Sequence, residues 1–141
     1  MPSKRALRRI VLIVSIALFV ASLTQKCYCT TSYCGDSFFI FLFGPLGFYL
    51  SLAGATWLAN PLLITSWIKV SKEPKLSFWT SLLAATISLS FLLFKNVMDN
   101  ENGDLREIVS YSLGYWLWLA SCLSMLIGNS FLNSKRYLHS S

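Results

Sequence analysis

The segment that decides the fold is residues 37–68, which read SFFIFLFGPLGFYLSLAGATWLANPLLITSWI and contain no Asp, Glu, Lys or Arg. Three other segments, residues 10–23, 76–94 and 108–134, are also free of charge. A helix rises about 1.5 Å per residue and the hydrocarbon core of a bilayer is about 30 Å thick, so roughly 20 apolar residues cross it. The segments are apolar at consecutive positions, whereas the strands of a membrane barrel alternate. We therefore expect an integral membrane protein built of helices.

The composition of the whole chain agrees with this class. Of its 141 residues, 55% are hydrophobic and 13% are charged, whereas about a quarter of the residues in a soluble domain are charged. A soluble domain of this size would leave its surplus apolar side chains exposed as large patches. Disordered chains are rich in charge and poor in aromatic residues, so the composition excludes disorder as well.

We predict an all-α fold, a bundle of four transmembrane helices that forms a single domain over residues 1–141. The helices are expected at about residues 7–24, 45–68, 76–94 and 108–129. The second helix is expected to begin at Pro45, because proline suits the first turn of a helix and is disfavoured in its interior. Residues 38–43 then form a short interfacial entry segment before it.

The first helix has an alternative interpretation as a signal peptide. A basic N-terminal region precedes its apolar run, and Val20-Ala21-Ser22 offers the small residues of a cleavage site. We favour a retained helix, because the stems of Arg8 and Arg9 can extend and carry their charges to the headgroups. Cleavage of residues 1–22 stays open as the alternative.

The basic residues are distributed unevenly among the segments that join the helices. Nine of the 12 fall in the N-terminal tail, between the second and third helices, or in the C-terminal tail. They are Lys4, Arg5, Arg8, Arg9, Lys69, Lys72, Lys75, Lys135 and Arg136. Positive residues accumulate on the cytoplasmic side, so we predict four crossings with both termini inside (N-in/C-in), in a bacterial inner membrane. Contact with anionic lipid then explains the net charge of +6, and no nucleic-acid partner is expected.

The second helix carries two features that concern packing. Gly47, Ser51, Ala55 and Ala59 recur every four residues, a pattern that lets helix backbones approach closely in a membrane. Asn60 and Pro61 are expected to kink the helix, because proline frees a backbone carbonyl that a neighbouring group must then satisfy. We interpret Asn60 as a residue that caps this kink or bonds a neighbouring helix.

Three of the four cysteines lie together in the first connecting segment, which the charge distribution assigns to the non-cytoplasmic side. That compartment permits disulfides, and either Cys27–Cys34 or Cys29–Cys34 would pin the segment, whereas a Cys27–Cys29 bridge is sterically poor. Which pair forms stays open, and one thiol is left over. No histidine lies nearby and no second pair has finger spacing, which argues against zinc. We expect Cys122 to pack as a small hydrophobe.

The sequence predicts no catalytic, cofactor or metal site. The charge-free segments contain none of the carboxylates or histidines that proton-coupled carriers use, and no nucleophile–base pair or phosphate-binding glycine loop is recognisable. We expect a small multi-pass protein without enzymatic activity, acting through contacts with lipid, with another membrane protein or with itself. The alternatives are a thiol–disulfide redox membrane protein that uses Cys27, Cys29 and Cys34, and a toxin-immunity or resistance factor.

Overall fold

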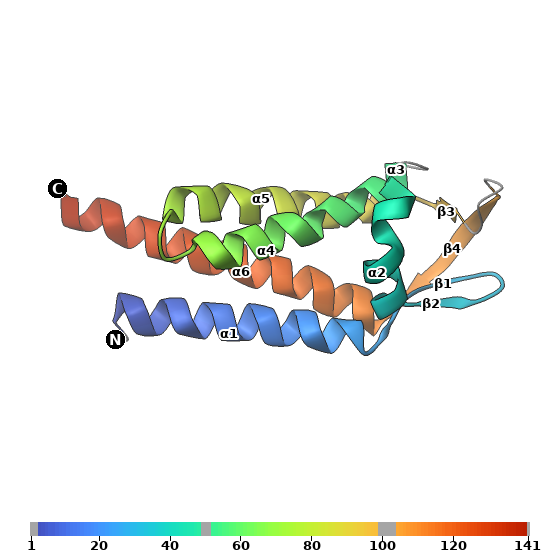
Figure 1. Cartoon of the computed structure of the whole chain (residues 1–141), viewed down its shortest axis with the longest axis horizontal. Coiled ribbons are helices and arrows are strands. Elements are labelled where there is room, and N and C mark those ends of the chain that lie inside the picture. The colour runs from blue at the N-terminus through green and yellow to red at the C-terminus, as the bar shows by residue number, and fades with distance from the viewer. Residues whose placement is uncertain (1–2, 49–51, 99–103, 141) are drawn as a thin grey trace.

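The computed structural model describes residues 3–48, 52–98 and 104–140. It consists of an elongated bundle of helices with a small sheet at one end, and both chain termini lie at the other end (Figure 1). Three of the helical segments are long and apolar enough to cross a membrane: Lys4–Leu23, Pro74–Leu93 and Leu113–Ser134. They overlap three of the charge-free segments, residues 10–23, 76–94 and 108–134.

The long helices run back and forth between the two ends. α1 (Lys4–Leu23) leads from the terminal end toward the sheet, and α6 (Leu113–Ser140) returns beside it. α4 (Ala59–Lys69) and α5 (Pro74–Ser90) form an antiparallel pair against them, and η2 (Phe91–Leu93), a short 3₁₀ turn, continues α5. The predicted helix over residues 108–129 is wrong at its start, since α6 begins at Leu113.

The segment over residues 37–68 does not form the predicted helix from Pro45 with a short entry piece. Its first part is one helix, α2 (Ser37–Phe48), which contains Pro45 in its interior and lies across the sheet end of the bundle (Figure 1). The remainder is α3 (Leu52–Ala55), η1 (Thr56–Leu58) and α4. The 3₁₀ turn η1 ends three residues before Pro61, which lies in the first turn of α4 and lacks the N–H that would bond to the carbonyl of Trp57.

The sheet contradicts the prediction of an all-α fold. It contains β1 (Lys26–Thr30), β2 (Cys34–Asp36), β3 (Asn96–Met98) and β4 (Leu105–Tyr111), paired antiparallel in the order β2-β1-β4-β3. Tyr28 in the first connecting segment is opposite Tyr111, directly before α6. The strand pairing thereby provides hydrogen-bond partners for the backbone N–H and C=O groups of the segments that connect the helices.

Two reciprocal serine pairs, which we call the serine clasps, join the helices. In the first, Ser15 of α1 and Ser121 of α6 each donate to the other's backbone carbonyl, at 3.0 and 2.7 Å. In the second, Ser66 of α4 and Ser77 of α5 do the same, at 3.0 and 2.7 Å. All four side chains are fully buried. A hydroxyl in an apolar interior requires such partners.

The clasps are connected to each other through two further side chains. The indole of Trp67 on α4 donates to the hydroxyl of Ser15 at 2.9 Å. The amide of Asn129 on α6 donates into the second clasp, at 3.0 Å to the hydroxyl of Ser77. Polar contacts therefore join all four long helices in one network.

The predicted stripe of small residues is divided between different elements. Gly47 lies on α2, and Ser51 falls outside the described residues. Ala55 is half-buried at the end of α3, whereas Ala59 is fully buried at the start of α4. The three described positions therefore lie on three separate helices and not on one.

Helices α1 and α6 approach each other closely at Gly128 of α6. A Cβ atom at this position would overlap the side chain of Val11 on α1.

We expect Gly128→Leu to destabilise the protein by about 1–3 kcal/mol through overpacking, measured as a lower melting temperature in detergent. Ser130→Leu, two residues away on an exposed face of the same helix, should melt like the parent, and equal melting of both variants would contradict the contact.

Candidate functional site: an apolar cavity beneath the sheet

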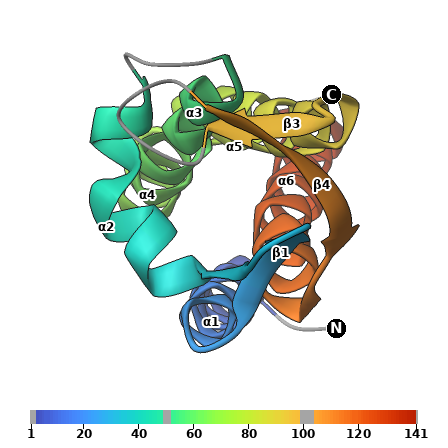
Figure 2. The same ribbon diagram turned by 90° about the vertical axis from the view of Figure 1, so that its right-hand side faces the viewer.

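A cavity of about 600 Å³ lies at the sheet end of the bundle. This volume is within the range of about 300–1,000 Å³ that is typical of small-molecule sites. Figure 2 views this end and shows α1, α2, α3 and β4 arranged around the axis of the bundle. The walls are mainly apolar and come from α1, β1, β2, α2, α3, η1 and α6, with further residues from α4, η2 and β3. The aromatic residues include Phe19, Phe39, Phe41, Phe43, Trp57, Phe91 and Trp118.

One wall of the cavity depends on the interior proline of α2. Pro45 has no N–H, so the carbonyl of Phe41, four residues earlier, loses its donor within the helix. The indole Nε1 of Trp57 donates to this carbonyl at 2.9 Å. Gly44 lets the ring lie there, because a Cβ atom at that position would overlap the indole. These residues fasten α2 to η1 and hold it over the cavity.

Asn60 lies at the start of α4, where this helix contacts α6. Its Oδ1 accepts a hydrogen bond of 2.8 Å from the indole of Trp118. The residue is buried and borders the cavity. Asn60 therefore joins neighbouring helices beside Pro61, and it is one of the polar residues that line the cavity.

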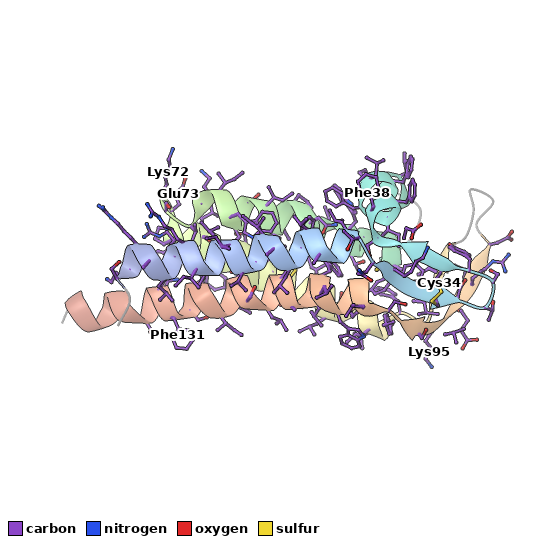
Figure 3. All side chains as sticks on the ribbon, turned by 90° about the horizontal axis from the view of Figure 1, so that it is seen from below. Cys34, Phe38, Lys72, Glu73, Lys95 and Phe131 are labelled. Atoms are coloured by element: carbon purple, nitrogen blue, oxygen red, sulfur yellow. A yellow bond between two sulfur atoms is a disulfide. The ribbon has the colours of Figure 1, made fainter. Side chains whose placement is uncertain are left out.

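The structure separates the three cysteines of the first connecting segment. Cys29 of β1 and Cys34 of β2 are directly opposite in the register and form a disulfide. Figure 3 places Cys34 at the sheet end of the molecule. Cys27 remains a free thiol that borders the cavity. The fourth cysteine, Cys122, is buried in α6.

The thiol of Cys27 is unsuited to nucleophilic chemistry. Burial raises its pKa to about 12, and the nearby hydroxyl of Ser37 opposes this only in part. That hydroxyl is itself buried and has no other hydrogen-bond partner among the described residues. A thiol with a raised pKa is inert at neutral pH, because the thiolate is the reactive form.

Phe91, which borders the cavity, packs against Tyr111 of β4. The Tyr111 hydroxyl donates to the carbonyls of Phe91 and Phe94, both at 3.3 Å, where the last turn of η2 ends. Burial raises the pKa of Tyr111, so the hydroxyl stays a donor. Within the described ranges, no group of three His, Cys, Asp or Glu residues could hold a metal ion.

Sequence reasoning identified Asn60 and the cysteines but missed the residues that build the cavity. The available signal was Pro45, which predicts an unsatisfied carbonyl at Phe41 and hence a donor from elsewhere. Comparisons with protein-family models, with curated proteins and with solved structures found no match. The functional proposal below therefore depends on the geometry of this site.

We expect Cys27 to react slowly with iodoacetamide between about pH 7 and 10 in a Cys122→Ala background, because its folded pKa stays above this range. Denaturation should accelerate the reaction, since the free thiol ionises near its ordinary pKa of about 8.5. A suitable control carries Ser32→Cys at the exposed hairpin in a Cys27→Ala, Cys122→Ala background and should react fast. Mass spectrometry measures the rates, and equally fast alkylation of native Cys27 would contradict its burial.

Proposed function

We propose that this chain is a four-crossing protein of the bacterial inner membrane, without catalytic activity, that binds a lipid hydrocarbon chain in the cavity beneath the sheet. Contact with lipid is thus its mode of action. The observation that carries the proposal is that α2, a helix apolar on all its faces, covers a cavity of about 600 Å³.

The charge distribution supports four crossings with both termini in the cytoplasm. Both termini and the connection between α4 and α5 lie at one end of the bundle (Figure 1), and nine of the 12 basic residues belong to these segments. Figure 3 shows Lys72 and Glu73 at the end of the bundle where the termini lie, and Lys95 at the sheet end. The fourth crossing is the run from α3 to Lys69, about 27 Å long as a helix and close to the hydrocarbon thickness.

The surroundings of α2 support a ligand that comes from the bilayer. The side of α2 that carries Ile40 and Phe41 borders the cavity. Phe38, Leu42 and Leu46 are 49%, 55% and 66% exposed. A helix that is hydrophobic all round needs an apolar medium on each side, so α2 would lie among lipid chains. A hydrocarbon chain could then reach the cavity without crossing water.

The thiol–disulfide alternative has one observation in its favour, the exposure of Cys34 at the hairpin. Against it, the leftover thiol of Cys27 is half-buried and its pKa is raised to about 12, so it cannot readily attack the disulfide. The non-catalytic proposal is therefore preferred. Sensitivity of a deletion strain to a membrane-active toxin would instead favour the toxin-immunity alternative.

The membrane topology is tested with reporter fusions. A fluorescent protein that folds in the cytoplasm should be bright at either terminus, and alkaline phosphatase fused there should be inactive, because the basic end faces inward. Fusions at Asp104, beside β4, should give the opposite result. Active phosphatase at either terminus would overturn the proposed orientation.

Lipid binding is tested by photo-crosslinking with phosphatidylcholine that carries a diazirine near the end of one acyl chain. We expect mass spectrometry to find saturable adducts on cavity residues such as Ile40. Ala53→Phe places a ring where Ala53 borders the cavity and should lower this labelling about tenfold. Leu42→Phe, on the exposed side of α2, should leave it unchanged. Equal labelling of both variants would mean that the chain adheres only to the outer surface.

A further inference from the structure

A second, much smaller cavity lies at the basic end of the bundle. It measures about 70 Å³ and lies where the first turns of α1, the connection between α4 and α5, and the end of α6 meet. Its polar lining consists of Lys4, Arg8, Ser71 and Asn133, and its apolar lining includes Val70 and Leu132. Two cations and two neutral polar residues thus line a small, partly open space.

Arg8, one of the residues that line this cavity, carries an unsatisfied donor. Its Nε atom is buried and has no hydrogen-bond partner within the described part of the chain. A buried donor without a partner is costly, and more so when the group is charged. The neighbouring Arg9 carries the same charge on an exposed face of α1.

No acidic side chain near the site is free to pair with Arg8. Glu73 is the acidic residue of the basic end, and its carboxylate already binds the Lys69 ammonium at 2.6 Å. The other acidic residues that the structure describes, Asp36, Asp104 and Glu107, lie in the sheet region at the opposite end. Within the described residues, the ion pairs do not include Arg8, and an anion from outside these residues would supply its acceptor.

We propose that this cavity binds a phosphate group, supplied by the headgroup of an anionic phospholipid. A guanidinium donates through a planar fork that matches phosphate oxygens, and Lys4 adds a second positive charge. Ser71 and Asn133 offer neutral donors for the remaining oxygens. The small volume suits a headgroup and not a hydrocarbon chain, and basic pockets between transmembrane helices are known to hold such groups.

The proposal is independent of the cavity beneath the sheet, so either can fail without the other. The test uses the full chain in nanodiscs of phosphatidylcholine with a minor fraction of phosphatidylglycerol, followed by native mass spectrometry of the retained lipid. The parent protein should retain one phosphatidylglycerol. Arg8→Gln should weaken retention about tenfold, as expected for loss of a charge-assisted hydrogen bond. Arg9→Gln removes the same charge and should retain the lipid.

A second variant distinguishes lost binding from lost folding. Asn133→Leu projects an apolar side chain into the cavity, leaves every basic residue in place and should also abolish retention. Added inorganic phosphate identifies the source of the group: displacement of the lipid assigns the site to free phosphate, and retention assigns it to the headgroup. Equal retention by the parent, Arg8→Gln and Asn133→Leu would overturn the proposal.

Discussion

The structure depends on a constraint that applies to every polar group in an apolar medium, which is that it must find its partner within the protein. The serine clasps meet this constraint in pairs. Ser15 and Ser121 satisfy each other across α1 and α6, and Ser66 and Ser77 do so across α4 and α5. Individual hydrogen bonds of this kind contribute about 0.6 kcal/mol on average. The reciprocal contacts also fix how each helix is rotated about its axis and how far it is shifted along its neighbour.

The same constraint separates what the sequence could predict from what it could not. The charge-free segments predicted where most helical residues lie, because burial in lipid excludes charge whatever the neighbours are. The sheet was missed, since Tyr28 and Tyr111 meet only through long-range pairing that leaves no local pattern. The segment around Pro45 was misjudged because proline was expected at a helix start. Its cost inside α2 is offset by Trp57, a residue distant in sequence.

The candidate site shows a similar division. Asn60 was singled out because an amide at membrane depth needs a partner, and Trp118 is that partner. The pairing of Cys29 with Cys34 was one of two that the spacing allowed, and the strand register selects it. The cavity itself could not be foreseen, since its volume arises where α2 turns across the bundle. Its aromatic walls look in the sequence like ordinary apolar residues.

The pairing of β1 with β4 has a consequence for biogenesis. β1 emerges from the ribosome early, but its partner strand is synthesised only just before the last helix. The hairpin of β1 and β2 can close and oxidise at once, because its strands are adjacent in the chain. The rest of the sheet must wait until nearly all of the polypeptide has been made, and slow long-range closure of this kind is typical of non-local contacts. The cavity beneath the sheet therefore cannot be complete before β4 and the first turns of α6 have been made.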